Sequence, residues 1–396
     1  MTITAEPTRI SCKEAGYSED VVQRLEQHFA KLIESDKIQC ASYLLSRNGQ
    51  VFADGAAGQL HYKLPDSQFK QHAIRRIASI TKLFTAVAIF QLIEQGKLFL
   101  RQPVADWIEE FKHPMFEQIS IMHLLTHTSG LAADPFYYLE PYPVGWGQIR
   151  FAFEPEEEGE DGAAVPSEQL EKQKQTSWIR ALLAGKPLSR PGEEWNYSSS
   201  GYTLLGEVIA RASGMRYEHY VMEHIVAPLG MKRTFFEVPE ELQHEVCIIN
   251  DYEMKRLERS KLGAYDAPRA GGGLYSTLWD LFRFGQMLLN GGQLDGVRIL
   301  SRKSVEKMSG NVLDKGIHAF SWGGKIKDKT YGLGPLLIPA GEWLSENTFG
   351  HEGAGRCILL LDQGRNAVIL FFVPSNTDWC PESMIGTQNI IGAGWL

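Results

Sequence analysis

The stretch "CILLLDQGRNAVILFFV", residues 357–373, contains two apolar runs that are separated by a polar turn at 363–366. Runs of this length and composition predict two β-strands that pair as a hairpin. A second stretch, "CASYLLSRNGQVFADG" at 40–55, places Asn48-Gly49 between two further runs, and this dipeptide is the strongest short signal for a tight hairpin. Because one apolar hairpin lies near each end of the chain, we predict one antiparallel sheet formed from both ends.

Other parts of the chain have the spacing of helices. Apolar residues recur at helical spacing after Ser18, which is the expected N-cap, and "ITKLFTAVAIFQLIEQG" (80–96) predicts a long helix that ends at Gly96. "STLWDLFRFGQMLLNGG" (276–292) predicts another, with Ser276 as its N-cap. Further helices are expected over 170–183 and 202–213. The predicted fold class is α/β (α+β): an antiparallel sheet flanked by helices, from residues 1–78 and 265–396, with an inserted helical region over 79–264.

The overall composition limits the partners that the chain can have. A net charge of −8 and a pI of about 5.8 argue against nucleic acid or an anionic membrane as a partner. The first twenty residues lack the basic head and apolar run of a secretion signal, which predicts a cytoplasmic protein. The five cysteines are odd in number and include no CxxC pair, so we expect reduced thiols and neither a disulfide framework nor a zinc site.

Lys82 is the only charged residue between Ile77 and Ile93, and Ser79 precedes it by three positions. Residues three apart lie on one face of a helix, so the Lys82 amine can reach the Ser79 hydroxyl. The positive end of a helix favours an alkoxide at Ser79, and removal from water favours a neutral lysine that can act as a base. The pair predicts a serine nucleophile with a lysine partner.

The same spacing also allows a structural interpretation, in which Ser79 caps the helix and Lys82 extends its charged end to solvent. The chain contains two other Ser-x-x-Lys pairs, at residues 67 and 70 and at residues 304 and 307. Both lie in polar stretches, and only Ser79 begins a long apolar helix. Other parts of the chain have to decide between the two interpretations.

Six further blocks point to a family. They are "LLTHTSGL" (124–131), "PGEEWNYSSSGY" (191–202), "PLGMKRT" (228–234), "AGGGLYST" (270–277), "YGLG" (331–334) and "TFGHEGAGRCILLL" (348–361). Together with Ser79 and Lys82, the chain resembles the serine hydrolase superfamily of class C β-lactamases, penicillin-binding proteins and family VIII carboxylesterases. The resemblance covers most of the chain. It implies the β-lactamase/transpeptidase-like fold, with the active site where the sheet and the helical region meet.

The resemblance implies catalytic roles for the matching residues. Ser79 would be the nucleophile that forms an acyl-enzyme, and Lys82 and Tyr197 would share the proton transfers. Which of these two is the general base stays open.

The resemblance also implies an oxyanion hole. It would be formed by the backbone N–H groups of Ser79 and Ala354. Ala354 is expected on an edge strand after His351, where Gly353 lets the strand approach the substrate without a side chain in the way.

Three positions depart from the pattern of many family members. Ser199 stands where lactamases and penicillin-binding proteins usually have an asparagine that binds the substrate's acylamide, and His351 replaces a lysine of many lactamases. Glu352 stands where a threonine or serine commonly helps to hold a substrate carboxylate, so it would repel an anionic substrate if its side chain faces the pocket. The departures at Ser199 and Glu352 argue against strong β-lactamase activity, and a histidine at 351 is more typical of the esterase and D-amino-acid peptidase branches.

Three other features have competing interpretations. The aromatic and acidic insertion around 135–165 predicts either a solvated loop or a lid over a pocket. His123 and His127 have the i, i+4 spacing of metal ligands but lack the intervening glutamate of zinc proteases, so no metal site and no cofactor are predicted. No phosphate-loop lysine follows the glycines at 271–273, which predicts close backbone packing and not a nucleotide site.

The leading prediction is a metal-independent serine hydrolase that acts on a small-molecule ester or amide, with carboxylesterase activity expected first. A D-amino-acid-specific peptidase or amidase, an acyltransferase and a weak β-lactamase are alternatives on the same catalytic set. A catalytically silent homologue that serves as a binding or scaffold protein is the non-enzymatic alternative. The natural substrate and the oligomeric state are left open by the sequence.

Overall fold

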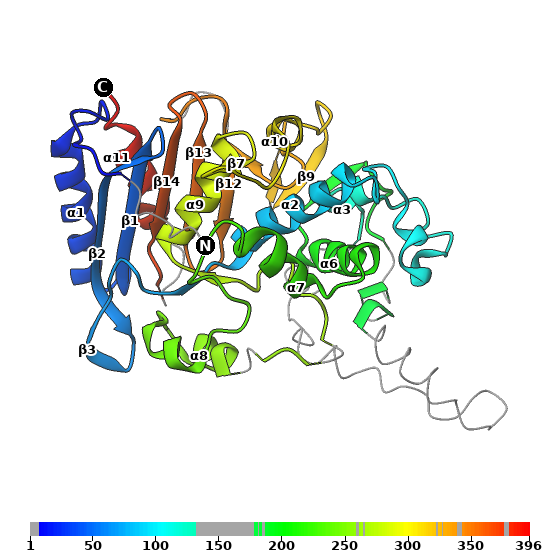
Figure 1. Cartoon of the computed structure of the whole chain (residues 1–396), viewed down its shortest axis with the longest axis horizontal. Helices are drawn as coiled ribbons and strands as arrows, with labels where there is room; N and C mark the ends of the chain where they lie inside the picture. Colours follow the sequence, from blue (N-terminus) through cyan, green and yellow to red (C-terminus); the bar gives the residue numbers. More distant parts are fainter. Residues whose placement is uncertain are drawn as a thin grey trace.

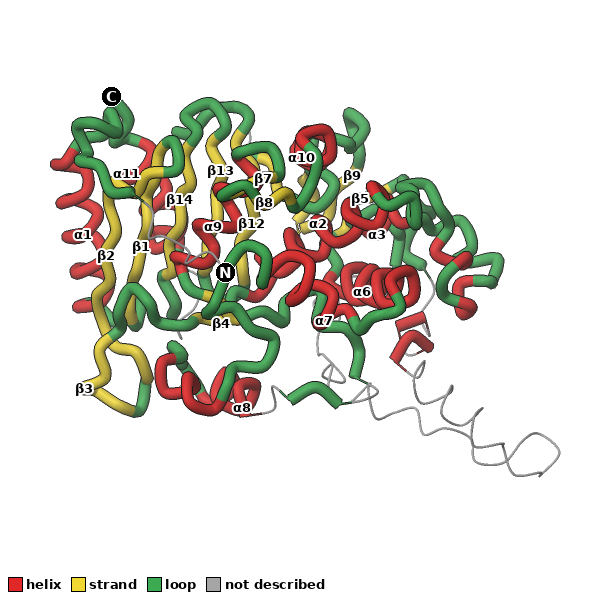
Figure 2. The backbone as a smooth tube through the Cα atoms, viewed as in Figure 1, coloured by secondary structure: helices red, strands yellow, loops and turns green. Residues whose placement is uncertain are grey.

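A computed structural model gives the arrangement of the chain (Figures 1 and 2). The insertion predicted around 135–165 and most of the helix predicted over 170–183 lie outside the described residues. The structure describes residues 8–131, 178–180, 182–183, 187–258, 261–263, 266–321, 324–326, 328–338, 343–375 and 380–396.

A seven-stranded antiparallel sheet takes strands from both ends of the chain, as predicted (Figure 1). β1 pairs with β14 from Ser42 opposite Phe372 to Arg47 opposite Ala367. Between β1 and β2, Asn48-Gly49 has φ angles of 52° and 77°, and two positive φ angles are what a type I′ turn requires. The strands in sheet order are β11 (Leu336–Leu337), β12 (Thr348–Gly353), β13 (Cys357–Asp362), β14 (Ala367–Phe372), β1 (Cys40–Arg47), β2 (Gln50–His61) and β3 (Leu64–Gln68).

Helices cover both faces of this sheet (Figures 1 and 2). α1 (Glu19–Glu34) and α11 (Thr387–Gly392) pack on one face, in a core that includes Tyr43 and Phe371. α9 (Leu278–Leu289) packs on the other face, in a core that includes Leu44 and Leu370. Successive strand residues point to opposite faces. Because both faces are covered here, β13 and β14 are fully buried and are nearly continuous apolar runs in the sequence.

Two predicted helix caps have different outcomes. Ser18 occupies the N-cap position of α1, although its side chain makes no capping hydrogen bond. The N-cap of α9 is Thr277, whose side chain accepts a hydrogen bond from the N–H of Asp280, so the prediction of Ser276 is wrong by one residue. Ser276 instead ends strand β6 (Tyr275–Ser276), and its hydroxyl lies 2.8 Å from that of Thr234.

α2 (Thr81–Glu94), which carries the predicted lysine, lies between the inserted helices and the sheet region, where Phe84 stacks on Phe284 of α9. Eleven of its fourteen residues are buried, which explains why its sequence is apolar on all sides. α2 packs on α6, and α6 packs on α3. Further α-helices are α3 (Ile121–Leu125), α6 (Ser199–Ser213), α7 (Tyr217–Val221), α8 (Asp251–Glu258) and α10 (Arg302–Ser309). Residues 178–180 and 182–183, at the end of the helix predicted over 170–183, are helical as well.

One pair of short strands connects the two predicted regions: β5 (Glu194–Asn196) pairs in parallel with β9 (His318–Ser321). Another short pair, β4 (Arg75–Arg76) with β6, lies within the predicted sheet region. β5 comes from the predicted helical region and β9 from the C-terminal region, so the division of the chain at 78/79 and 264/265 stays a prediction. The remaining strands are β7 (Gln293–Leu294), β8 (Val297–Arg298) and β10 (Gly324–Ile326).

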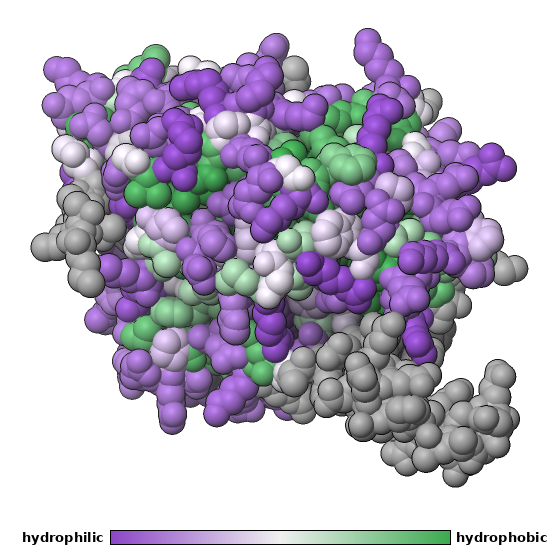
Figure 3. Space-filling view, turned by 45° about the vertical axis from the view of Figure 1, so that its right-hand side comes forward, coloured by the Kyte–Doolittle hydropathy of each residue, from purple (hydrophilic) through white to green (hydrophobic). Residues whose placement is uncertain are grey.

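Figure 3 shows one face on which hydrophilic side chains predominate, with separate apolar groups between them. Among the described residues, every helix falls short of the length and apolar character that a membrane-spanning segment needs. All five cysteines are free thiols, and the sulfurs of Cys40 and Cys247 lie 3.6 Å apart in the buried interior.

Candidate active site

Ser79 lies in a single 3-10 turn, η1 (Ala78–Ile80), which runs directly into α2. Two hydrogen bonds to Leu274 hold this turn. The N–H of Ile77 donates to the Leu274 oxygen at 3.0 Å, and the N–H of Leu274 donates to Thr81 Oγ1 at 3.1 Å. The backbone around the candidate nucleophile is therefore fixed on both sides of the serine.

Lys82 lies fully buried one turn after Ser79. Its Nζ donates to the Gly271 oxygen at 2.6 Å and lies 3.1 Å from both Ser79 Oγ and Ser199 Oγ. It also lies 4.8 Å from the centre of the Tyr197 ring. The interpretation in which Lys82 extends to solvent is therefore wrong, because three hydrogen bonds hold its amine in the interior.

The glycine run at 271–273 brings backbone close to this amine, as predicted. A Cβ at Gly271 would lie 3.0 Å from the backbone oxygen of Ser199, which is tighter than ordinary packing. Gly271 thus allows its own carbonyl and the start of α6 to approach Lys82 together.

Tyr197 follows β5 and reaches the same cluster. Its ring centre lies 4.5 Å from that of His127 and 6.2 Å from that of His351. Four residues named from the sequence, Ser79, Lys82, Tyr197 and Ser199, thus lie together although they come from two distant parts of the chain.

His351 lies on β12 and is 1% exposed. Its Nδ1 lies 2.6 Å from the carbonyl oxygen of Glu352, which can only accept, so the proton is on Nδ1. Burial and the charge of Lys82 lower the pKa of His351 to about 3. The ring is therefore neutral, and its Nε2 is a buried acceptor without a partner among the described residues.

β12 approaches the serine turn very closely at Gly353. A Cβ there would lie 2.2 Å from the Ile77 oxygen, so only glycine fits. Ala78, on the opposite side of this contact, has a φ of 44°, a left-handed conformation that is uncommon for residues with a Cβ. Strained backbone of this kind is concentrated at functional sites.

The structure corrects the position of Ala354. We expected it on an edge strand, but β12 ends at Gly353 and Ala354 lies in the following turn. β12 is also the second strand of the sheet, because Gly350 and Phe349 pair with β11. The described part of β11 does not extend to residues 351–353.

Two residues near the cluster were missed as site residues by the sequence interpretation. His127 is buried against Tyr197. In the sequence, only its place in the family block at 124–131 connected it with the active site. Lys329 lies with its ammonium 4.8 Å from the centre of the Trp195 ring. Burial lowers the pKa of Lys329, and attraction to the carboxylate of Glu352 partly opposes this effect. The positive charge of Lys329 in turn helps to lower the pKa of His351. No local pattern marks Lys329.

The ring nitrogens of His123 and His127 do not converge on a shared position for a metal ion. His123 Nδ1 accepts the N–H of Ser120 at the start of α3, whereas His127 Nδ1 accepts the N–H of Ser198. In the parts of the chain that the structure describes, no three side chains of the metal-ligating types come together.

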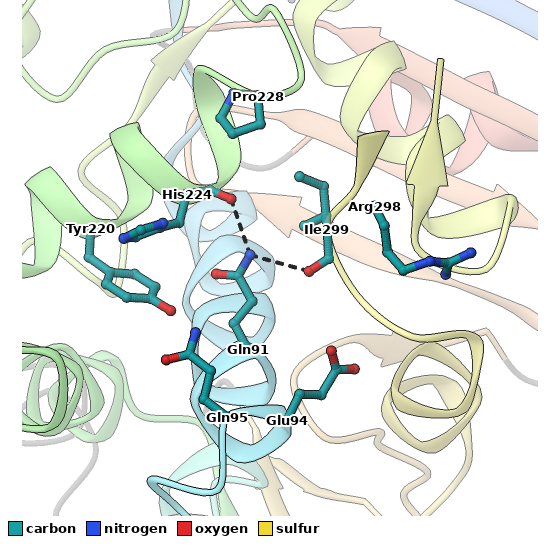
Figure 4. Close-up of a pocket in the computed structure, with 8 residues that line it drawn as sticks. All are labelled: Gln91, Glu94, Gln95, Tyr220, His224, Pro228, Arg298 and Ile299. Carbon is teal, nitrogen blue, oxygen red and sulfur yellow. Dashed lines mark hydrogen bonds between the residues drawn. The ribbon is translucent and has the colours of Figure 1, made fainter. Parts of the chain in front are cut away.

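A separate cavity of about 360 Å³ lies at the other end of α2 (Figure 4). Gln91, on its floor, donates to the carbonyl oxygens of His224 and Ile299. About three helical turns, roughly 18 Å, separate Gln91 from Ser79. The cavity is therefore not part of the Ser79 cluster. Its lining residues are Gln91, Glu94, Gln95, Tyr220, His224, Pro228, Arg298 and Ile299.

The neutral state of His351 predicts a pH-dependent stability. Its pKa is about 3 in the folded protein against an ordinary value of 6.5. Between these values the unfolded chain binds a proton that the folded protein does not, so the free energy of unfolding falls as the pH is lowered through this window. We expect His351→Gln to remove a part of this dependence on the order of 3 kcal/mol.

Urea unfolding at pH 4 and pH 7 measures this effect. The exposed His244→Gln variant is the control and should keep the wild-type difference between the two pH values. If His351→Gln also keeps that difference, His351 is not held neutral in the folded protein.

Several known proteins are similar to this chain in sequence or in fold. A family model described as beta-lactamase matches residues 25–380. Protein Rv1367c of Mycobacterium tuberculosis is 29% identical over 343 residues, which cover 78% of each chain. A D-amino acid amidase from Ochrobactrum anthropi SV3 has a TM-score of 0.67 at 21% identity, covering 94% of this chain and 97% of that one. A family VIII carboxylesterase also has a TM-score of 0.67, at 20% identity over 96% and 98% of the chains.

The two solved structures share the β-lactamase/transpeptidase-like fold with this chain, as the sequence blocks implied. The family model extends from α1 to the segment before α11, and so includes the whole Ser79 cluster. The chain therefore belongs to the beta-lactamase family of serine hydrolases.

Proposed function

We propose that the protein forms an acyl-enzyme on Ser79 and hydrolyses a carboxylic ester or amide of a small molecule, with carboxylesterase activity as its main activity. The observation that carries the proposal is the contact between the buried Lys82 Nζ and Ser79 Oγ, at 3.1 Å. A lysine amine that is removed from water and bonded to a serine hydroxyl is the arrangement expected of an activated nucleophile.

The contacts of Lys82 suggest how a proton would leave Ser79. When Lys82 is neutral, its two N–H groups can donate to the Gly271 oxygen and to Ser199 Oγ. The lone pair then faces the hydroxyl of Ser79 and can take its proton. Tyr197, whose ring lies over the same amine, is the second candidate for this transfer.

In the proposed reaction, Ser79 Oγ attacks the substrate carbonyl carbon and its proton passes to Lys82 or Tyr197. The N–H groups of Ser79 and Ala354 would bind the oxyanion. The leaving alcohol or amine takes the proton as the bond to it breaks. Water then attacks the acyl-enzyme by the same route in reverse, which releases the acid and frees Ser79.

The uncharged ring of His351 argues for a substrate without a negative charge. At the position where many lactamases carry a lysine, this chain has an uncharged ring whose buried Nε2 can accept a hydrogen bond but cannot hold a carboxylate. Glu352, exposed beside it, adds negative charge at the same place. Both features favour neutral esters over anionic β-lactams.

The amidase, acyltransferase and scaffold alternatives differ in measurable ways. The similarity to a D-amino acid amidase supports the amidase alternative, and Glu352 could attract the ammonium group of an aminoacyl amide. An acyltransferase would pass the acyl group to an alcohol or amine in place of water. A scaffold would have no need of an activated serine.

A substrate panel tests the proposed function. It contains nitrophenyl esters with neutral acyl chains, D- and L-aminoacyl nitroanilides and a chromogenic cephalosporin. We expect kcat/KM to be at least about tenfold higher for a neutral ester than for the other classes, and Ser79→Ala to abolish turnover. A preference for D-aminoacyl amides would replace the esterase assignment by an amidase, and a protein that turns over no member of the panel would support the scaffold alternative.

A further inference from the structure

Tyr197 lies between two backbone N–H groups that both donate to a single residue. The N–H of Asn196 donates to the carbonyl oxygen of His127 at 2.8 Å, and the N–H of Ser198 donates to His127 Nδ1 at 3.0 Å. The residues directly before and after Tyr197 are therefore bound to the backbone and to the side chain of the same histidine.

The conformation of His127 makes this double contact possible. Its φ of 58° is left-handed, which is uncommon for a residue with a Cβ. The side chain is 2% exposed and packs among aromatic rings, with its ring centre 4.5 Å from that of Tyr197 and 5.1 Å from that of Tyr331. Packing and hydrogen bonds thus hold the ring on both of its sides.

The hydrogen bonds of His127 define a single tautomer. Because Ser198 donates to Nδ1, the ring proton is on Nε2, which lies 3.1 Å from the hydroxyl of Tyr331. Tyr331 in turn donates its own proton to the Gly334 oxygen at 2.9 Å. The chain of donors runs in one direction, from Ser198 through His127 and Tyr331 to Gly334.

Protonation of His127 would break this chain. A second ring proton on Nδ1 would face the N–H of Ser198, which can only donate. Burial and the nearby charge of Lys82 keep the pKa of His127 well below its ordinary value. Because Nδ1 accepts the N–H of Ser198, His127 acts there as a neutral acceptor and not as a proton carrier.

We propose that His127 is the positioning residue of Tyr197, and that Tyr331 orients His127 for this task. The proposal rests on the proposed function, in which Tyr197 takes part in proton transfer. His127 sets the place of the Tyr197 backbone relative to Lys82. It does so without contacting the substrate.

Two substitutions of His127 distinguish the contribution of Nδ1 from that of Nε2. In His127→Asn the side-chain oxygen takes the place of Nδ1 and can accept the N–H of Ser198, and asparagine tolerates a left-handed φ. In His127→Gln the amide reaches the place of Nε2 but leaves no acceptor at Nδ1. We expect His127→Asn to keep kcat within about fivefold and His127→Gln to lower it by about 10- to 100-fold, with KM changed less than about threefold.

Two tyrosine substitutions test whether Tyr331 orients His127, one at Tyr331 and one at a matched control position. Tyr331→Phe removes the acceptor of His127 Nε2–H, and we expect kcat to fall by about 3- to 30-fold. Tyr17→Phe removes a hydroxyl that likewise donates to a backbone oxygen, that of Ile391, at 2.8 Å in the other core. It should leave kcat unchanged. The pH–rate profile should keep its wild-type shape in both His127 variants, because a neutral positioning ring does not titrate there.

Amide hydrogen exchange tests the positioning without any turnover. We expect the N–H of Ser198 to exchange at least about tenfold faster in His127→Gln than in wild type and His127→Asn. If the exchange is unchanged in His127→Gln, or if kcat is equal in the two His127 variants, the proposal is overturned. A wild-type protein without hydrolytic activity would overturn the proposed function, and the exchange rates would still decide whether His127 holds the segment around Tyr197.

Discussion

Lys82→Ala is expected to lower kcat/KM for the preferred ester by about two to four powers of ten, the usual scale for loss of nucleophile activation. The reason is that the substitution removes the amine that lies 3.1 Å from Ser79 Oγ. Tyr197→Phe should cause a loss in the same range, because it removes the other candidate proton carrier. Steady-state kinetics with a nitrophenyl ester measures both effects.

Lys307→Ala is the matched control, since Lys307 belongs to another Ser-x-x-Lys pair and lies on the exposed side of α10. It should leave kcat/KM unchanged, and a metal chelator should have no effect on the wild-type protein. A Lys82→Ala variant that stays active while a chelator abolishes wild-type activity would favour metal catalysis over the serine mechanism.

Glu253→Gln is expected to have the largest effect on stability, lowering the free energy of unfolding by about 3–5 kcal/mol. Arg75 is fully buried and donates to the Glu253 carboxylate, which is nearly as buried. Burial raises the pKa of Glu253, but the charge of Arg75 outweighs this and holds the pKa below its ordinary value. Without the carboxylate, the guanidinium would be a buried charge that lacks a counter-ion.

Urea unfolding at pH 7 measures this change. Glu306→Gln is the control, because its ion pair with Lys303 is exposed, and exposed pairs contribute at most about 1 kcal/mol. A loss below about 1 kcal/mol in Glu253→Gln would show that other groups compensate the charge of Arg75.

The features that the sequence predicted well are those with local signals. Asn48-Gly49 fixes a tight turn through two positive φ angles, so the hairpin at 40–55 could be predicted from two residues. Ser79 and Lys82 lie within one helical turn, so the spacing shows that their side chains can meet, and the family blocks favoured that contact over an exposed lysine. Tyr197 and His351 lie 118 and 272 positions after Ser79 in the sequence. Only the family blocks connected them with the serine.

The features that the sequence did not reveal depend on tertiary contacts. The role of His127 requires its left-handed backbone and the N–H of Ser198, neither of which leaves a pattern in the chain. The N-cap of α9 is a choice between two adjacent hydroxyl residues, and the pairing of β6 with β4 takes Ser276 into a strand and leaves Thr277 to cap the helix. The position of Ala354 depends on where β12 ends, and strand ends are set by the partner strand.

Mass spectrometry after incubation with a fluorophosphonate tests the central claim, an activated Ser79, most directly. We expect one adduct, on the peptide that contains Ser79. It should be absent in Ser79→Ala and form much more slowly in Lys82→Ala. Label on Ser67 or Ser304, or on no serine at all, would contradict the account.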